Sequence, residues 1–517
     1  MGQVVVNDQM GLIDLGQKID GIDVLIVLGV GSGEGYRALS SWLKKEEGRF
    51  LVFIESKEEL FLAAKDLSLA KDPKVRLLFY KEGNEEIFRQ IAWEFVFLRF
   101  GFAVLDPQET EDAKVLFAQL EHYHRGTDLL ASDCEDMGRK VLTNVLRNLS
   151  ALPRSKMGHA LEGKCTGMPA IVCGAGASLD AAMPLLARLK DRAVIFSGGS
   201  AGRALSAQGI TPHFAAHVDP LPPRERFLGQ DHFEVPLFYQ GRFCHTLLES
   251  VHSPLVWMPD SGSYPMEAWL GSECGLFAER FDAGWTVANF CTAVAAYLGC
   301  STVIFVGMDF SCKPDQMYAA NMVGEADGLI QVAQGQQVLH SKRDWLMSAE
   351  WMGAFAKKHP EIRWLNATSG GIDLAGVERK ELSAVVEEVL TQQWDVQGIV
   401  HALIAGAPLA DVTVQQIDNV RKRVKESFEK GLSLCEALLK IWERHYPNSP
   451  LETAEYALVE CELEQEICSL HFLTPLWNVW RWPILRTSFH PLGSHVHRLL
   501  FFKQALEVHL PHLRSYS

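Results

Sequence analysis

The sequence predicts an α/β fold with parallel sheets in an N-terminal and a central domain, followed by an all-helical C-terminal domain. Short apolar strands alternate with helical stretches in the first three quarters of the chain, which is typical of parallel sheets. Helical periodicity dominates from about Leu382 onward. These changes place the domains at 1–145, 146–385 and 386–517, and about three domains fit a chain of 517 residues.

The N-terminal domain is predicted to be Rossmann-like. A strand at Val24–Gly29 leads into Gly-Val-Gly-Ser-Gly-Glu-Gly, a helix over Tyr36–Lys45 and a second strand ending at Glu55. Glycines after a strand let backbone N–H groups approach a phosphate, and an acidic side chain on the next strand can bind ribose hydroxyls. The residues of this candidate dinucleotide or S-adenosylmethionine loop are Gly29, Gly31, Gly33 and Glu55. A ligand-free unit used for assembly is the alternative.

In the central domain, two glycine turns follow predicted strands. Cys-Gly-Ala-Gly-Ala-Ser-Leu-Asp follows the strand that begins at Ala170, and Ser-Gly-Gly-Ser ends the next strand. Ligands bind outside the carboxyl ends of parallel strands, so both turns are predicted to hold one nucleotide, with Ser178 capping the next helix and donating to a phosphate. Two ordinary strand-to-helix turns are the alternative. The predicted nucleotide-binding residues are Gly174, Gly176, Ser178, Ser197, Gly198, Gly199 and Ser200.

Two aspartates also follow predicted strands, Asp219 in His-Val-Asp-Pro and Asp309 in Gly-Met-Asp. A carboxylate there can hold a metal, bind a sugar hydroxyl, act as a general base or cap a helix. His217 has a pKa range suited to a base, although a lone histidine is more often structural. The zincin, Walker A and nucleophile-elbow motifs are absent from the sequence, which disfavours those enzyme classes, and no metal ligands are predicted.

The net charge and the cysteines indicate which partners and which cellular compartment the protein has. The chain has 49 Lys and Arg against 64 Asp and Glu, a net charge of −15, which disfavours nonspecific nucleic-acid binding. Its 11 cysteines are scattered without a C-x-x-C pair, which fits reduced thiols in the cytoplasm. No signal peptide is expected, and Ala283–Met308 is predicted to be a buried helix and strand, so no transmembrane segment is expected.

The last 40 residues are rich in tryptophan and histidine. They are predicted to form a helical hairpin whose tryptophans pack into the bundle, with a partner or membrane-surface contact as the alternative. The sequence leaves the oligomeric state open.

Five ordered segments resemble a known family. They are IVCGAGASLD, IFSGGSAGRAL, GITPHFAAHVDP, GWTVANFCTAVAAYLGCSTVIFVGMDF and LNATSGGIDLAG. Over roughly residues 150–385 they resemble the central domain of the motility-associated-factor (Maf) flagellin glycosyltransferases, which is itself similar to the archaeal 6-hydroxymethylpterin diphosphokinase (MptE-like, DUF115). The resemblance implies a sialyltransferase-like fold. It also implies transfer of a nonulosonic acid, such as pseudaminic or legionaminic acid, from a CMP-sugar to Ser or Thr of flagellin.

The resemblance also implies roles for individual residues. The two glycine turns would hold the nucleotide, and Asp219 and Asp309 would line the site. The chemistry of such a transfer needs a base for the acceptor hydroxyl, for which Asp219, His217 or Asp309 is the candidate. Tyr318 would protonate or bind the leaving phosphate. The rim of the site would be completed by Thr286, Asn289, Thr368, Ser369, Gly370 and Gly371.

The chain departs from the family pattern at three places. Ala177 stands where the family usually has proline, His213 where it usually has aspartate, and Trp285 where residues tend to be smaller. These departures bear on the substrate more than on the fold. The alternatives are pyrophosphate transfer from ATP to a pterin alcohol, with Asp219 and Asp309 on Mg²⁺, and a non-catalytic binding or assembly protein.

Overall fold

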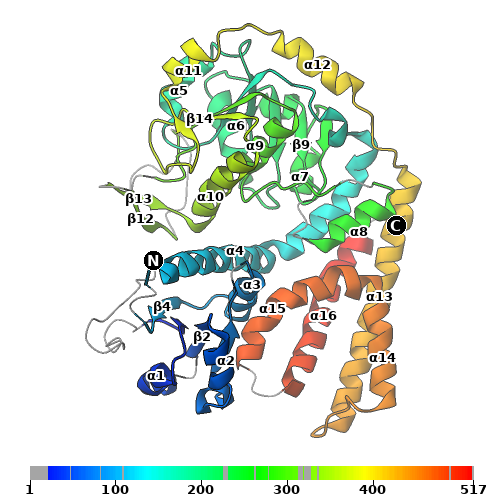
Figure 1. The fold of residues 1–517 in the computed structure, drawn as a ribbon. Helices are drawn as coiled ribbons and strands as arrows, with labels where there is room; N and C mark the ends of the chain where they lie inside the picture. The colour runs from blue at the N-terminus through cyan, green and yellow to red at the C-terminus, as the bar shows by residue number, and fades with distance from the viewer. Residues whose placement is uncertain are drawn as a thin grey trace. The chain divides into compact units, whose positions relative to one another are not determined.

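The computed structural model describes residues 21–514, apart from 47, 82, 107–109, 225–230, 261–263, 277–278, 313–317, 320–327, 335–336 and 488–490 (Figure 1). Contacts between residues divide the chain into two compact units. One comprises Met1–Glu135 and Leu476–Arg498, and the other comprises Asp136–Pro475 and Leu499–Ser517. The three-domain division with boundaries near residues 145 and 385 stays a prediction.

The first unit contains a parallel sheet in the order β3-β2-β1-β4. Its strands are β1 (Val24–Leu28), β2 (Phe50–Glu55), β3 (Val75–Phe79) and β4 (Phe100–Val104). Its helical segments are α1 (Glu34–Lys45), α2 (Glu58–Ala64), η2 (Ser68–Lys71), α3 (Glu86–Glu94) and the first part of α4 (Thr110–Asn148). Apolar side chains of α1 pack on one face of the sheet, and those of α3 and α4 pack on the other. The predicted parallel α/β unit is therefore confirmed.

The second unit contains a sheet of nine described strands in the order β15-β14-β11-β6-β7-β8-β9-β10-β5, all paired in parallel. The strands are β5 (Ser155–Met157), β6 (Pro169–Cys173), β7 (Val194–Ser197), β8 (Phe214–His217), β9 (Leu237–Tyr239), β10 (Leu255–Trp257), β11 (Thr302–Val306), β14 (Arg363–Asn366) and β15 (Glu378–Arg379). From β6 the chain proceeds outward to β10 and then returns to β11, on the other side of β6. The strand order therefore reverses between β6 and β11, which is where open α/β sheets bind ligands.

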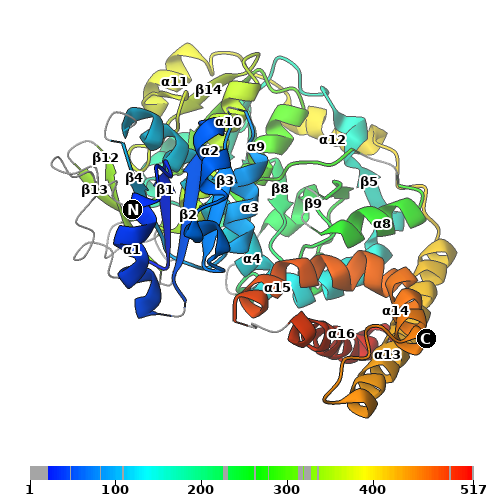
Figure 2. The ribbon, with the colours of Figure 1, turned by 60° about the horizontal axis from the view of Figure 1, so that its bottom comes forward.

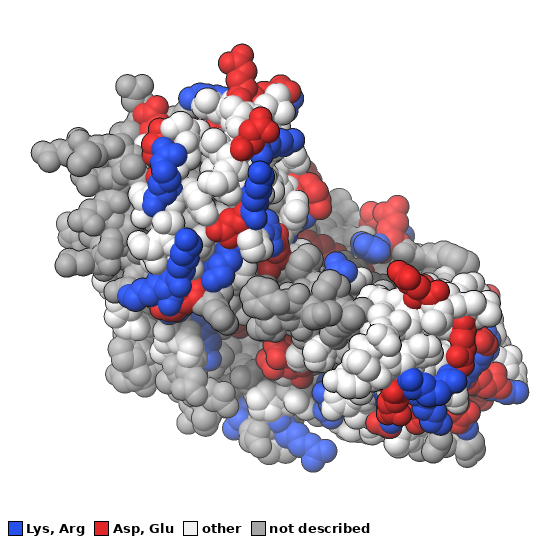
Figure 3. All heavy atoms as spheres, turned by 90° about the horizontal axis from the view of Figure 1, so that it is seen from below, with Lys and Arg blue, Asp and Glu red and all other residues white. Residues whose placement is uncertain are grey.

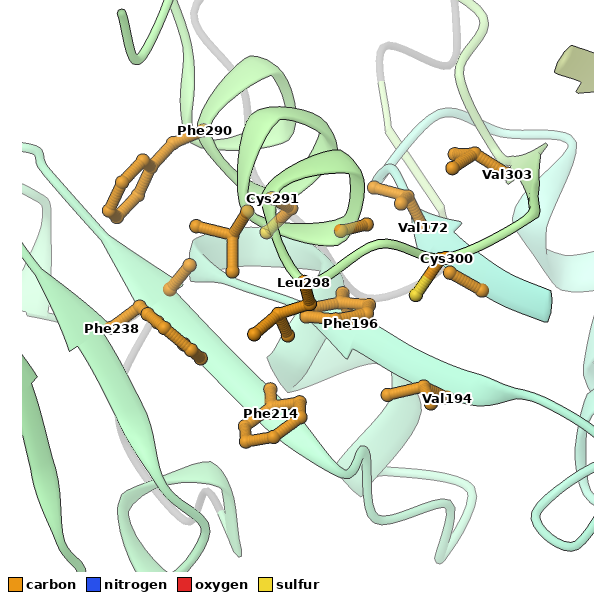
Figure 4. Packing of buried hydrophobic residues seen from close by; sticks show 14 of the residues in the cluster. Val172, Val194, Phe196, Phe214, Phe238, Phe290, Cys291, Leu298, Cys300 and Val303 are labelled. Carbon is orange, nitrogen blue, oxygen red and sulfur yellow. The ribbon is translucent and has the colours of Figure 1, made fainter. Parts of the chain in front are cut away.

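Helices cover both faces of this sheet. One face packs against α9 (Val287–Tyr297), α10 (Arg343–Lys358) and α12 (Val396–Gly406), and the other against α5 (Leu179–Leu186), α6 (Gly199–Ser206) and α11 (Leu382–Glu388). Figure 4 shows Phe290 of α9 and Leu298, which directly follows this helix, lying over Phe196, Phe214 and Phe238 of three neighbouring strands. These strands are fully buried because helices lie on both faces, which explains why their sequences are continuous apolar runs.

Shorter elements complete the second unit. They are η4 (Leu149–Arg154), η5 (Gly158–Leu161), η7 (Asp231–Glu234), α7 (His245–Leu248), α8 (Pro265–Glu273) and an antiparallel hairpin of β12 (Ile330–Gln334) and β13 (Gln337–Ser341). Figure 2 shows α8 and this hairpin. Gln334 of this hairpin donates to the Gly371 carbonyl at 3.2 Å, which ties the hairpin to the segment after β14.

The C-terminal region is helical, as predicted. It consists of α13 (Val414–His445), α14 (Ala454–Gln465), the π-helical η8 (Cys468–Leu473), α15 (Thr474–Thr487) and α16 (Pro491–Arg514). Thr413 and Gln416 form a capping box that begins α13. None of the described helices combines the length and the apolar composition that crossing a membrane requires. Acidic and basic side chains are interspersed over the face drawn in Figure 3.

The last two helices form where the tryptophan- and histidine-rich hairpin was predicted. Trp477 on α15 is buried, and the packing of the tryptophans into the bundle stays a prediction. The side chain of Trp482 lies outside the described residues. A partner or membrane contact of this segment stays a prediction.

Candidate functional site

The loops after β6 and β11 interlock at the point where the strand order reverses. The Gly174 and Gly176 N–H groups donate to the Val306 and Gly307 carbonyls at 2.8 and 2.9 Å. A Cβ atom on Gly176 would lie 1.7 Å from Asp309 Oδ2, and one on Gly174 would lie 2.4 Å from the Gly307 carbonyl oxygen. Both positions therefore require glycine, because the two loops leave no room for a side chain.

Asp309 holds the turn after β6 through Ser178. The Ser178 hydroxyl donates to Asp309 Oδ2 at 2.8 Å, and its backbone N–H donates to the same oxygen at 3.2 Å. The predicted helix cap is therefore wrong: α5 begins without a side-chain cap bond, because the hydroxyl points to Asp309. Burial raises the pKa of Asp309, while the bonds from Ser178 and the charge of Arg379 act in the opposite direction.

The segment after β14 wraps around Asp309. Thr368 accepts a bond from the Met308 N–H at 3.1 Å, and the Ile372 N–H donates to the Asp309 carbonyl at 2.8 Å. A Cβ on Gly371, whose φ is +81°, would lie 2.1 Å from that carbonyl oxygen. Thr368, Ser369, Gly370 and Gly371 thus lie at the rim of the strand-order reversal.

Two residues of this site were missed by the sequence analysis. Arg379 donates to the Thr368 and Gly370 carbonyls, both at 2.9 Å, and holds the segment after β14 in place. Phe310 has φ of +47°, a costly conformation for a residue with a Cβ that often marks functional sites. Neither residue belongs to a recognisable motif, so no local pattern indicated them.

The turn after β7 lies where the N-termini of two helices meet. A Cβ on Gly198 would lie 2.1 Å from the Ala216 carbonyl oxygen and 2.4 Å from Val287 Cγ1, so the first residue of α9 packs on the residue before α6. Among the described residues no side chain caps α6, and the space around Gly199 is open. The buried Ser197 hydroxyl has no hydrogen-bond partner among these residues. Two positive helix ends and unused donors favour an anion at this turn.

Thr286 and Asn289 form the capping box of α9. The Asn289 N–H donates to the Thr286 hydroxyl at 3.4 Å, and Asn289 Oδ1 accepts from the Thr286 N–H at 3.1 Å. The Asn289 amide also donates to the Ser348 carbonyl at 3.2 Å. Both side chains thus position the N-terminus of α9, and a direct contact with a ligand stays a prediction.

The remaining predicted catalytic residues differ in exposure. His217 is 1% exposed and stacks on Phe243 with ring centroids 5.1 Å apart, which is the arrangement of a structural histidine. Asp219 is partly exposed, and its Oδ1 accepts the Leu221 N–H at 3.0 Å. Tyr318 packs edge-on against Trp345, and the Ala319 N–H donates to the Ala175 carbonyl at 2.9 Å, so this segment lies beside the turn after β6. Asp219 is therefore better placed than His217 to meet a substrate.

In the first unit, acidic side chains occupy the predicted N-terminal ligand loop. Glu55 is 3% exposed and accepts the Val30 and Lys57 N–H groups at 3.0 and 2.9 Å. Glu34 accepts both the hydroxyl and the N–H of Ser32, which lowers the pKa of the Glu34 carboxyl. Gly29, Gly31 and Gly33 all have positive φ, as tight turns require. Hydrogen-bond donors of this loop, which the prediction assigned to a ligand, are thus bonded to the protein's own carboxylates. Cofactor binding here stays a prediction.

Glu55→Ala is expected to lower the free energy of unfolding of the first unit by about 1–3 kcal/mol, because two N–H groups would lose their acceptor. Urea unfolding checks this, with the exposed Glu135→Ala on α4 as the matched control. Equal stability of the two variants would contradict a structural role for Glu55.

Comparisons with known proteins show what the chain and its fold are similar to. Residues 143–315 match the family model described as 6-hydroxymethylpterin diphosphokinase MptE-like. The fold is similar to that of the Maf glycosyltransferase from Magnetospirillum magneticum AMB-1, with a TM-score of 0.54 and 17% identity over 96% of this chain and 78% of that chain. The chain has a Maf-like fold with a central MptE-like domain. No curated protein matches this Maf-like chain significantly.

The matched MptE-like segment contains the turns after β6, β7 and β11 but ends before β14. Arg379 and the rim at Thr368–Gly371 therefore lie outside it. Among the described residues of the Maf-like chain, no group of three or more His, Cys, Asp or Glu side chains could hold a metal ion.

Proposed function

We propose that this Maf-like chain is a glycosyltransferase that moves a nonulosonic, sialic-acid-like sugar from a CMP-sugar to Ser or Thr of a protein such as flagellin. The observation that carries the proposal is the meeting of the α6 and α9 N-termini at Gly198, beside the buried Ser197 hydroxyl. The N–H groups of Gly199 and Ser200 lie at this helix end and suit the single phosphate of CMP. The similarity to a Maf glycosyltransferase fold supports the same class of reaction.

The chemistry assigns a task to each part of the site. The acceptor hydroxyl oxygen attacks the anomeric carbon while the bond from that carbon to the CMP phosphate oxygen breaks. The helix ends at Gly198 stabilise the negative charge on the departing phosphate. The partly exposed Asp219 carboxylate accepts the proton of the acceptor hydroxyl. Asp309 positions the turn after β6 through Ser178.

The proposal predicts that CMP raises the melting temperature of the protein and that Gly198→Ala weakens CMP binding about tenfold or more. An added Cβ would lie 2.1 Å from a backbone carbonyl and would push the α6 N-terminus away from α9. Ser197→Ala, a smaller change, is expected to weaken binding less. Thermal-shift titration and calorimetry measure both effects by mass action.

Gly406→Ala at the end of α12 is the matched control, because a Cβ there meets no atom within 4 Å. Absence of any CMP effect on the wild-type protein would overturn the nucleotide site. Transfer from a CMP-nonulosonic acid to purified flagellin, followed by intact-protein mass spectrometry, tests the donor and the acceptor.

Pyrophosphate transfer from ATP to a pterin alcohol is the second candidate, favoured by the description of the family model. It would place Asp219 and Asp309 on Mg²⁺, whereas in the structure one Asp309 oxygen is held by Ser178. A Mg²⁺-dependent thermal shift with ATP, without one for CMP, would favour this reaction. A shift with CMP alone would favour glycosyl transfer.

A further inference from the structure

A cavity of about 420 Å³ opens beyond the ends of β9 and β10, away from the proposed nucleotide site. Its wall is mainly apolar and includes Val145, Leu149, Leu152, Trp257, Leu270 and Leu276. At about 4.8 Å per strand, β9 lies roughly 19 Å from β11, because three strands separate them. The cavity has the volume of a small-molecule site. It lies far from the interlocked loops at Asp309, whereas β9 is the direct neighbour of β8, after which Asp219 follows.

Two acidic side chains reach this cavity from different elements. Asp260, which follows β10, is 7% exposed, and Glu267 projects from α8. A Cβ on Gly241 would lie 2.7 Å from Glu267 Oε2, so the glycine makes room for this carboxyl group. Oε1 of Glu267 is shielded from solvent and accepts no hydrogen bond from the described residues. The cavity thus presents a carboxyl oxygen that the described residues leave without a hydrogen bond.

The surroundings of Glu267 disfavour its ionised form. Its burial and the negative charge of Asp260 raise the pKa of Glu267 well above its ordinary value, and the charge of Arg242 acts in the opposite direction. Arg242 also lies 5.4 Å over the Tyr264 ring. The other charged groups of the described wall are the exposed Glu279 and Arg280.

The wall is held rigidly by hydrogen bonds. The Asn148 amide donates to the Gly241 and Phe243 carbonyls at 2.8 and 2.6 Å. The Gln240 amide donates to the Pro259 carbonyl at 2.7 Å, which ties the residue before Asp260 to the end of β9. Arg421 on α13 donates to the Leu146 carbonyl and the Ser150 hydroxyl at 3.0 and 2.6 Å. The cavity is therefore preformed, which lowers the entropic cost of binding.

We propose that this cavity binds a small, largely apolar molecule that carries one protonated amine, held by Asp260 and Glu267. The apolar wall favours the body of such a ligand. An ammonium group donates hydrogen bonds to Asp260 and to the ionised Glu267, and its positive charge stabilises this ionised form, whereas a neutral or anionic group supplies no positive charge.

The test uses the full chain and three probes of similar size: 2-phenylethylamine, 2-phenylethanol and 3-phenylpropionate. Calorimetry is expected to show that the amine binds about tenfold or more tightly than the alcohol, and that the acid binds most weakly. Amine binding removes the proton of Glu267, so amine affinity is expected to rise with pH while the free carboxyl is still protonated. Glu267→Gln should remove this pH dependence and weaken binding of the amine about tenfold, while leaving the affinity for the alcohol unchanged.

The exposed Glu387→Gln on α11 is the matched control. Gly271→Phe is a second variant that fills the cavity, since a Cβ there lies at an ordinary 3.5 Å from the Leu276 carbonyl oxygen. It should abolish binding of all three probes while leaving the melting temperature near that of the wild type. Equal affinity for amine and alcohol, or amine binding that survives both Glu267→Gln and Gly271→Phe, would overturn the proposal.

Discussion

Gly176→Ala is expected to lower the free energy of unfolding of the second unit by about 3 kcal/mol, the upper end of the usual cost of overpacking. The added Cβ would lie 1.7 Å from Asp309 Oδ2 and 2.5 Å from its Cγ, so one of the two loops must move. Movement of either loop breaks the bonds between Ser178 and Asp309. We therefore also expect CMP binding to fall below detection.

Urea unfolding and CMP titration measure these two effects. Gly406→Ala, which meets no atom within 4 Å, should change the free energy of unfolding by less than about 0.5 kcal/mol. If Gly176→Ala were as stable as this control, the interlocking of the two loops would be wrong. If it were destabilised but still bound CMP with normal affinity, the turn after β6 would not belong to the nucleotide site.

Asp309→Asn is expected to weaken CMP binding without destabilising the folded protein at neutral pH. A neutral acceptor holds Ser178 less strongly than a carboxylate does, so CMP affinity should fall about tenfold. The folded protein should not lose stability at neutral pH, because burial makes ionisation of Asp309 unfavourable and raises its pKa above the ordinary 3.8.

The sign of the pH dependence follows from this raised pKa. The folded state binds the Asp309 proton more tightly than the unfolded state, so the associated stability is fully present below pH 3.8 and is lost as the pH rises through the folded pKa. Asp309→Asn removes that loss. Its stability relative to the wild type should therefore increase as the pH rises above 3.8 and then level off.

Unfolding curves at several pH values test this, with the exposed Asp411→Asn as the control for a carboxylate in solvent. A variant that becomes less stable than the wild type as the pH rises would show that the Ser178 and Arg379 interactions outweigh burial. Unchanged CMP affinity would remove Asp309 from the binding site.

Strong local patterns predicted the central strands of both sheets. β1, β6 and β11 are continuous apolar runs because helices cover both of their faces, and each appears where the sequence indicated a strand. The short outer strands β5 and β15 and the β12–β13 hairpin were missed. β5 has 3 residues and β15 has 2, and the hairpin is half exposed, so their sequences carry little hydrophobic periodicity.

In the candidate site, too, only features with a local sequence pattern could be predicted. The glycines of the turns after β6 and β7 were recognised because a strand, a turn and a helix are adjacent in the sequence. The stacking of His217 on Phe243 and the bridging bonds of Arg379 depend on neighbours in space, as does the bond from the Asn289 amide to the Ser348 carbonyl. The sequence therefore showed none of these structural contacts of the predicted site residues, and their contact with a ligand stays a prediction.

The sequence by itself determined the α/β class, the helical C-terminal region, the central strands and the position of the glycine turns, because these depend on short-range hydrophobic patterns and backbone conformation. Only the tertiary structure decided that β11 returns beside β6, which brings Asp309 to Ser178 across 131 residues of chain. It also decided that Glu34 and Glu55 fill the first glycine loop and that Glu267 lines a separate cavity. Such contacts follow from strand order and packing, to which distant parts of the chain contribute together.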